Sequence, residues 1–346
     1  MLFFILGLPG GFSGWCETVA AELLRRAGGV GEVIRADTLD QVALSAIHSG
    51  ASHAVVSSEQ PGGGLRAALA DHRRNYVVAL DDPRRALIEL VLGREIELAA
   101  SVQMLASSCA ALSGCAATPG VSGVSGVSGP LLLYGERDWP RAADTVAAIA
   151  RHLEIPVGED EIADLADGLE AADAVRPEYD SIAWWNSLAP AEQELVIGAL
   201  APYVDQPSPG AALSIAWGRD LFFLGDRPRE RARGPIDITG RARCLVQGPD
   251  IMLPPGSWSL SLTALFSRGA AEHQFLAEVW AAGPIASAMM RPHGEGSAAV
   301  TLDFALNEAG GHPIAVRVSS QRAAFDGSIE IVGARLLRAA LVPDEE

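Results

Sequence analysis

The chain has 346 residues, of which 43 are Asp or Glu and 26 are Arg; it contains no lysine, and its net charge is −17. This length usually corresponds to about two domains of roughly 150 residues, and 49% hydrophobic residues against 20% charged ones exclude a wholly disordered or fibrous protein. Without lysine, Schiff-base chemistry and a P-loop lysine are excluded. Because an acidic chain binds polyanions poorly, we expect neither nucleic acid nor anionic membrane as a partner.

Residues 1–172 alternate short apolar runs with amphipathic segments, which is typical of an α/β fold with a parallel sheet. We expect strands at Leu2–Leu8, Glu32–Arg35, His53–Ser57, Tyr76–Leu80 and Leu131–Tyr134. We expect the first helix to be capped by Ser13 and to end at Gly28 and Gly29. Further helices are predicted over Arg84–Ala111 (one helix or two), Pro140–Leu153 and Glu159–Leu169.

The chain start is apolar, but it lacks a basic segment and is too short for a spanning helix. No other run reaches about 18 apolar residues, so we predict no membrane span. The four cysteines form no CxxC pair, and no histidine stands at metal-ligand spacing, so we predict no metal site and a reducing, cytoplasmic location.

Three later segments depart from the alternation of apolar runs and amphipathic segments. Residues 118–130 repeat Val-Ser-Gly three times and predict a flexible loop. Residues 173–235 predict a connector with a short helix or two and an arginine-rich stretch. From 236 to 340 the period becomes two, as in SWSLSLTALF, and about seven or eight short strands predict an antiparallel β-sandwich or jelly roll.

A glycine turn, GLPGGFSGW, follows the first strand and opens a helix. Backbone N–H groups of such a turn bind anions, but the turn is equally compatible with a tight strand-to-helix connection that holds no ligand. The turn, YVVALDDPRRAL and LLLYGERDWPRAADTVAAIARHLEIPVGEDEI together resemble the sulfotransferase family. That family uses 3′-phosphoadenosine 5′-phosphosulfate (PAPS) as sulfuryl donor, so the resemblance implies a P-loop-like domain over residues 1 to about 170. The cofactor positions it implies are Gly10, Gly11, Ser13, Gly14, Asp82, Arg84 and Arg85.

The sequence departs from the family at positions where the family carries basic residues. The family's loop cation falls on Gly10, the leading arginine of its RDPR element on Asp81, and a lysine on Ser57. A charged hydrogen bond to phosphate contributes about 1.5–3 kcal/mol, so these losses predict a vestigial PAPS site and no expected cofactor. The cations within sequence reach are Arg73, Arg74, Arg84 and Arg85; Glu59 is the candidate general base if activity remains.

The C-terminal segment more loosely resembles jelly-roll carbohydrate-binding modules, through LPPGSWSLSLTALF and GSIEIVGARLL. Trp258 shares a face with leucines and is expected in the core. Trp280, Asp303 and Arg317 alternate opposite core residues, and we expect them to line one sheet face. That face is either a glycan-binding surface or a solvated outer face.

These observations lead to a first hypothesis of a non-catalytic pseudoenzyme. In it, a degenerate sulfotransferase-like domain is joined to a glycan-binding-like sandwich, and the protein serves bacterial surface polysaccharide synthesis, export or assembly with a polysaccharide or a protein as partner. The alternatives are an active PAPS-dependent sulfotransferase with an arginine-based donor site, and a structural protein that forms homo-oligomers and binds no sugar.

Overall fold

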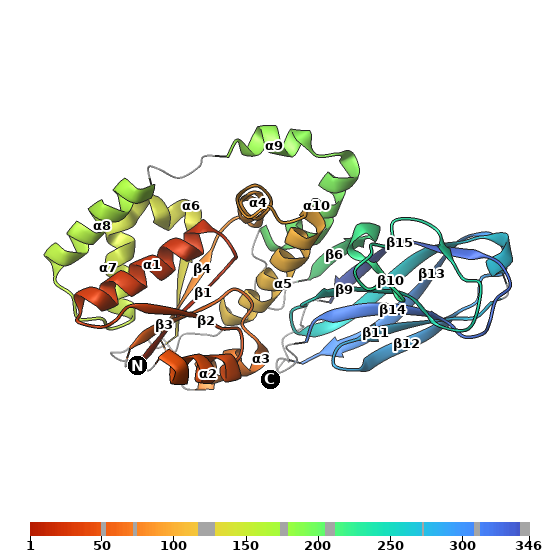
Figure 1. Cartoon of the computed structure of the whole chain (residues 1–346), viewed down its shortest axis with the longest axis horizontal. Coiled ribbons are helices and arrows are strands. Elements are labelled where there is room, and N and C mark those ends of the chain that lie inside the picture. The colour runs from red at the N-terminus through yellow and green to blue at the C-terminus, as the bar shows by residue number, and fades with distance from the viewer. Residues whose placement is uncertain are drawn as a thin grey trace. The chain divides into compact units, whose positions relative to one another are not determined.

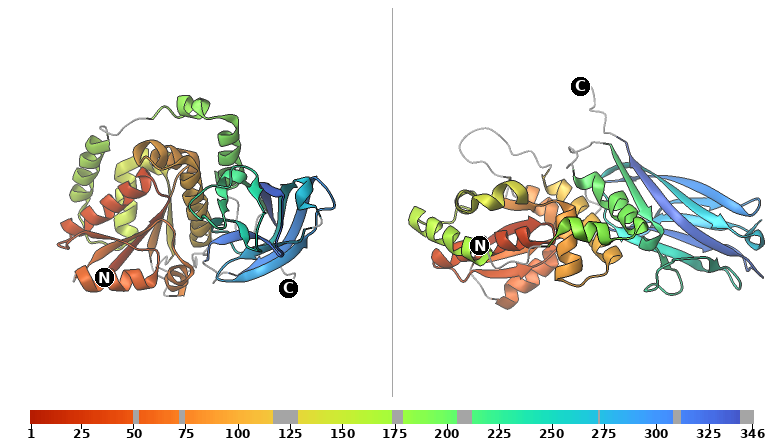
Figure 2. Two further views of the ribbon diagram at one scale, coloured as in Figure 1. Left: turned by 45° about the vertical axis from the view of Figure 1, so that its right-hand side comes forward. Right: turned by 90° about the horizontal axis from the view of Figure 1, so that it is seen from above.

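The computed structural model describes residues 1–49, 53–71, 75–116, 129–173, 179–204, 212–271, 273–307 and 312–339. The chain divides into two units: Met1–Ile96 with Ser108–Ser187, and Glu97–Ser107 with Leu188–Glu346. The first is an α/β unit and the second contains the β-sandwich (Figures 1 and 2). Most of the Val-Ser-Gly repeat (118–130), Arg73 and Arg74 lie outside the described residues.

The first unit is built on a parallel sheet in the order β2-β3-β1-β4-β5. Its strands are β1 Leu2–Gly7, β2 Glu32–Arg35, β3 Ala54–Ser58, β4 Tyr76–Leu80 and β5 Pro130–Tyr134. All five predicted strands are therefore confirmed to within a residue or two at their ends. Every residue of β3 and β4 is buried because both faces of the sheet are covered.

Helices cover the sheet on both sides, with α1, α7 and α8 on one face and α2 and α3 on the other (Figure 1). Their bounds are α1 Gly11–Arg26, α2 Leu39–Ser49, α3 Gly63–Asp71, α4 Pro83–Ile88, α5 Leu98–Ala116, α6 Gly135–Asp138, α7 Ala142–His152, α8 Glu159–Asp173 and α9 Ser181–Ser187. The segment expected as one helix or two contains α4, a π-helical turn over Glu89–Gly93, and α5.

The predicted cap of the first helix is wrong. The N-cap of α1 is Gly10, whose backbone is extended and makes no side-chain cap, and Ser13 is the third helical residue. Ser13 is buried against β1: a Cβ on Gly7 would lie 2.3 Å from its Oγ. The glycine therefore lets the helix pack closely on the strand.

The second unit contains α10 Pro190–Val204 and two antiparallel sheets. One sheet has the order β13-β10-β15-β6, with β8 also paired to β15; its strands are β6 Leu213–Gly218, β8 Ile236–Asp237, β10 Gly256–Phe266, β13 Gly296–Leu306 and β15 Ser328–Arg338. The other has the order β12-β11-β14-β9-β7; its strands are β7 Phe223–Leu224, β9 Cys244–Ile251, β11 Phe275–Trp280, β12 Pro284–Met290 and β14 Ile314–Ser320.

The sandwich core follows the period-two pattern. On β10 the predicted inward residues are buried, and Trp258 is 2% exposed with its indole N–H donated to the Pro254 carbonyl at 3.0 Å. Strands β6 and β7 lie within the stretch 173–235 that we expected to be a connector, yet they pair with β15 and β9. The strands of this unit therefore start at Leu213, earlier than expected.

No helix among the described residues is long and apolar enough to cross a bilayer.

Candidate functional sites

The first candidate site lies where the parallel strands of the α/β unit end at their carboxyl termini, which is the edge at which such folds bind ligands. The glycine turn follows β1 there, and Gly11 is the first residue of α1. The backbone N–H of Gly11 donates to Oε2 of Glu89 at 2.6 Å. A carboxylate of the protein itself therefore occupies the helix N-terminus, the position that favours an external anion.

Glu89 reaches the glycine turn because of the backbone that carries it. It is the first residue of the π-helical turn that follows α4, and single π-helical turns are frequent at functional sites. Its carboxylate also lies near Gly10, where an added Cβ would be 3.5 Å from Oε2. Gly14 continues the helix, its N–H bonded to the Gly10 carbonyl at 3.1 Å. The predicted loop residues thus lie together, and the partner that we did not predict is Glu89.

The arginines of the DDPRR segment make their contacts elsewhere. Asp82 caps α4 by accepting from the Arg84 N–H at 2.9 Å, and the Arg84 guanidinium returns to the same carboxylate through Nε at 3.2 Å and Nη2 at 2.9 Å. The Arg85 guanidinium lies 5.5 Å from the centre of the Trp139 ring. The structure thus gives Arg84 a capping contact with Asp82 and Arg85 a packing contact with Trp139.

Asp81 directly follows β4, and its carboxyl group is largely buried. Burial raises its pKa to about 6, although the positive charge of Arg85 opposes the rise. The Asp82 N–H donates to its Oδ1 at 2.9 Å. A Cβ on Gly135 would lie 2.6 Å from the same oxygen, so the glycine after β5 gives this carboxyl its space. In the family that the sequence resembles, this position carries a cation.

Two further carboxylates, those of Glu17 and Glu59, lie in this part of the α/β unit. Ser57 donates its hydroxyl to Oε1 of buried Glu17 at 2.5 Å. Glu59 forms an ion pair with Arg94 at 3.5 Å, and burial raises its pKa although the charge of Arg94 opposes the rise. Asp81 occupies one position where the family that the sequence resembles carries a cation, Glu17 lies beside a second, Ser57, and Glu89 lies beside the third, Gly10. A carboxylate at or beside these positions repels phosphate.

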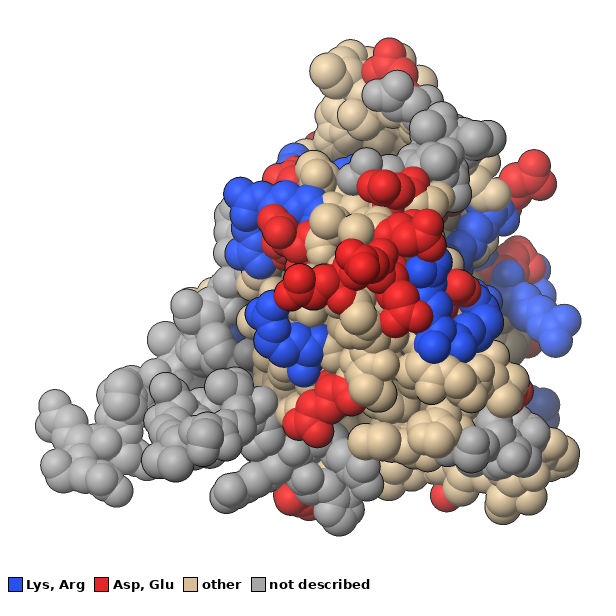
Figure 3. Space-filling view, turned by 90° about the vertical axis from the view of Figure 1, so that its left-hand side faces the viewer, with Lys and Arg blue, Asp and Glu red and all other residues tan. Residues whose placement is uncertain are grey.

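Acidic groups also dominate the exposed helices of this unit. Figure 3 shows acidic side chains gathered over the middle of one face, with arginines on either side. Helix α8 contributes Glu159, Asp160 and Glu161 in its first turn. Among the described residues, no three His, Cys, Asp or Glu side chains are placed to hold a metal ion.

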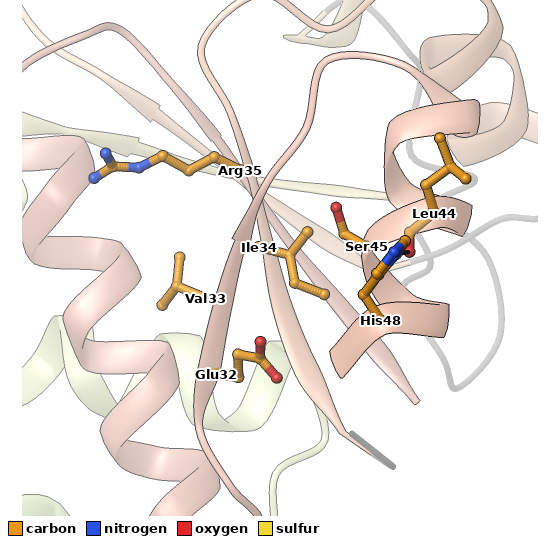
Figure 4. Close-up of a pocket in the computed structure, with 7 residues that line it drawn as sticks. All are labelled: Glu32, Val33, Ile34, Arg35, Leu44, Ser45 and His48. Carbon is orange, nitrogen blue, oxygen red and sulfur yellow. Dashed lines mark hydrogen bonds between the residues drawn. The ribbon is translucent and has the colours of Figure 1, made fainter. Parts of the chain in front are cut away.

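A hollow of about 460 Å³ lies beside the edge strand β2 of the same sheet. In Figure 4, Ile34 points toward Leu44, Ser45 and His48 of α2, while Arg35 points to the other side of the strand. No set of charged groups converges in it, and we do not assign it a role.

The second candidate site is the outer face of the sheet β12-β11-β14-β9-β7. One row of paired residues crosses all five strands on this face: Phe223, Gln247, Arg317, Glu278 and Ser287. At the centre of this row the Arg317 guanidinium stacks on the Trp280 ring, 3.8 Å from its centroid. We call this set, with Trp280, the sheet-face row.

The sheet-face row carries polar groups without partners. The Trp280 Nε1 and the Arg317 Nε are both buried and, within the described part of the chain, neither has a hydrogen-bond partner. Directly beside Arg317, the side chains of Gln247 and Glu278 likewise make no hydrogen bond or ion pair to described residues. Buried donors are normally paired in native proteins, and these two N–H groups are therefore candidates for hydrogen bonds to a ligand.

Asp303 does not belong to this face, and the expectation that it lies beside Trp280 and Arg317 is wrong. It is on β13, in the other sheet, opposite Ser259. It lines a hollow of about 830 Å³ with Ser257, Ser259 and Leu337 at the end of that sheet. Alternation alone gives a residue's face within its own strand, and it does not say which of two sheets the strand joins.

Neither a protein-family model nor a curated protein sequence matches the chain. Among solved structures, the chain is similar to a mouse sulfotransferase complexed with PAP, with 11% identity over 56% of this chain and 79% of that one and a TM-score of 0.40.

It is also similar to carbohydrate-binding modules. TmCBM61 in complex with β-1,4-galactotriose shares 15% identity over 36% of this chain and 88% of that one, with a TM-score of 0.24. The CBM36-1 domain of a multidomain xylanase from the hindgut metagenome of Trinervitermes trinervoides shares 11% identity over 37% and 99%, with a TM-score of 0.27.

Proposed function

We propose that this protein is a non-catalytic glycan-binding protein, which binds an uncharged saccharide on the sheet-face row of its sandwich. The observation that carries the proposal is the Trp280–Arg317 stack, in which two buried N–H donors have no partner among the residues that the structure describes. An aromatic ring binds the apolar face of a sugar, and donors placed beside it bind the hydroxyl groups.

The charges beside the stack favour a neutral ligand. A sugar hydroxyl both donates and accepts, and the row offers donors on Trp280 and Arg317 and acceptors on Glu278 and Gln247. Asp250 lies near enough to Arg317 for the arginine to oppose the rise that burial causes in the pKa of its carboxyl. An anionic sugar would meet Glu278 and Asp250 as well as Arg317, so the carboxylates disfavour it.

The α/β unit, in this proposal, does not bind PAPS. The Glu89 carboxylate on Gly11 N–H supports this part, because a phosphate would have to displace it. The nearest family-matched arginine, Arg84, is held by both oxygens of Asp82. Sulfuryl transfer needs positive charge on the leaving phosphate oxygen, and this edge is lined with carboxylates. A role in polysaccharide synthesis, export or assembly would fit such a protein.

The test is a neutral-glycan array probed with the full chain, followed by titration calorimetry with the best oligosaccharide. We expect micromolar binding that is weakened in Trp280→Ala and in Arg317→Ala and retained in Asp303→Ala. Calorimetry with PAPS and with adenosine 3′,5′-bisphosphate is expected to show no binding. Glycan binding unaffected by both row substitutions would refute the assigned site, and micromolar PAPS binding would refute the non-catalytic assignment.

A further inference from the structure

Phe325 is 97% exposed, the highest value among the large hydrophobic residues of the described chain. It lies in the turn between β14 and β15. The preceding residue, Ala324, is buried and exchanges two backbone hydrogen bonds of 2.9 Å with Gly240. The following turn packs so tightly that a Cβ on Gly269 would overlap Oδ1 of Asp326. The exposed ring therefore stands on a backbone that is fixed on both sides.

The turn of Phe325 belongs to a set of four loops that leave the sandwich at one end. In one sheet, the end of β10 pairs with the starts of β13 and β15 through Phe266↔Gly296 and Phe266↔Ile329. In the other sheet, the start of β11 pairs with the ends of β12 and β14 through Phe275↔Met290 and Phe275↔Ser320. The Gly240–Ala324 bridge adds the segment after β8. We call these segments, 238–243, 267–274, 291–295 and 321–327, the loop end.

The loop end is basic although the chain is acidic. Its four segments carry five arginines and three carboxylates, whereas the whole chain has 26 and 43. Four of these arginines are exposed, and within the described residues none of their guanidinium groups has a hydrogen bond or an ion pair: Arg241, Arg268, Arg291 and Arg322.

The fifth arginine, Arg243, has a different task. It donates to the carbonyls of Thr239 and Asp237 at 2.9 and 2.6 Å, and these bonds brace its own loop, which the Gly240–Ala324 bridge joins to the turn of Phe325. The exposed Arg241 and Arg322 thus stand on the same braced backbone as the phenylalanine.

We propose that the loop end docks the protein on an anionic membrane surface, with Phe325 inserted among the lipids and the four exposed arginines on the phosphate and carboxylate headgroups. An unsupported ring that projects into water is suited to insertion into an apolar layer. A ring that stacks on a sugar, such as Trp280, is by contrast backed by its own sheet. Arginine contacts with anionic headgroups act over about a Debye length, roughly 8 Å at physiological ionic strength. The charge of the loop end therefore governs docking, and the proposal departs from the expectation that the net charge of −17 excludes an anionic membrane.

The test is cosedimentation of the full chain with vesicles of phosphatidylcholine alone and with about one third phosphatidylserine. We expect binding to the anionic vesicles only, and its loss as salt rises from about 0.1 to 0.5 M. Phe325→Ala should weaken binding about tenfold, and Arg241→Gln, Arg268→Gln and Arg322→Gln about fivefold each. The matched control Ile47→Ala removes a hydrophobe that is 76% exposed in the α/β unit and should change nothing.

Several outcomes would overturn the proposal. One is the absence of binding to anionic vesicles at micromolar protein; another is unchanged vesicle binding of Phe325→Ala. Binding to soluble polygalacturonate that needs the arginines and not Phe325 would assign the loop end to an acidic glycan. Self-association in light scattering that Phe325→Ala abolishes would assign it to a second copy of the chain. Phe325 contributes no core packing, so Phe325→Ala tests docking without unfolding the protein. Trp280→Ala should leave vesicle binding unchanged.

Discussion

The two candidate sites of this protein differ in what their donor groups contact. At the strand ends of the α/β unit, the Gly11 N–H is held by Glu89 and the Arg84 guanidinium by Asp82. On the sheet-face row of the sandwich, the Trp280 and Arg317 N–H groups have no protein partner within the described chain. A binding site needs groups whose hydrogen bonds are left for the ligand, because a ligand must otherwise displace an internal partner of similar strength.

If the α/β unit binds no PAPS, as we propose, the same difference separates ligand binding from the fold. The glycine turn keeps its close packing, since Gly7 still makes room for Ser13. The anion site on the same turn is occupied by a side chain from a segment 78 residues away. Fold and ligand binding therefore depend on different residues of one loop.

The largest effect is expected from Trp280→Ala on the sheet-face row. The substitution removes the stacking ring and also the support of Arg317, so affinity for the neutral oligosaccharide should fall about 30- to 200-fold, or about 2–3 kcal/mol. Calorimetry with wild type and variant measures it, with Asp303→Ala, on the other sheet, as the control. A loss of the same size in Asp303→Ala would show that the ligand binds to the other sheet.

Asp81→Asn should stabilise the α/β unit at neutral pH. Burial raises the Asp81 pKa from 3.8 to about 6, so between these values the folded state holds a proton that the unfolded state has lost. The free energy of unfolding therefore falls as pH rises through about 4 to 6. Asparagine, which stays neutral, should add about 1–3 kcal/mol at pH 7.5 and nothing at pH 4. Urea unfolding at both pH values measures this; an equal effect at the two would mean that charge is not the cause.

Glu89→Ala is expected to weaken the N-terminus of α1. It removes a charged hydrogen bond and a favourable charge at the positive end of the helix, which together contribute about 1–2 kcal/mol. Glu89→Gln, which keeps the oxygen acceptor, should cost less. Neither variant should gain affinity for adenosine 3′,5′-bisphosphate in calorimetry, because Arg84 stays on Asp82. Micromolar binding by Glu89→Ala would instead show that this single carboxylate had closed a competent donor site.

The smallest effect is expected from Glu59→Gln. Its ion pair with Arg94 is partly exposed on both sides, and such pairs contribute about 0.2–1 kcal/mol at most. Urea unfolding should therefore detect little change, and incubation with labelled PAPS and a sugar acceptor should show no transfer for wild type or variant. Transfer by the wild type that Glu59→Gln abolishes would make Glu59 the general base of an active enzyme.

The elements were predictable because they follow local periodicity. In β3 and β4, a run of apolar residues indicates a strand that is buried on both faces. In β10, the strict alternation of apolar and polar residues indicates burial on one face. The same alternation in β11 places Glu278 beside Trp280, a signal that could have added the glutamate to the candidate site. The Ser13 cap was wrong because a buried serine in a tight turn looks, in sequence, like an N-cap.

What the sequence alone determined is the pair of folds and the absence of the family's cations, since both depend on residue type and spacing along one chain. Only the tertiary structure decided what the charged side chains contact and where they lie. Glu89 accepts from the Gly11 N–H, Arg317 stacks on Trp280, and Asp303 lies in the other sheet. These contacts join residues distant in sequence, and their pairing depends on strand order and side-chain direction, which local periodicity does not specify.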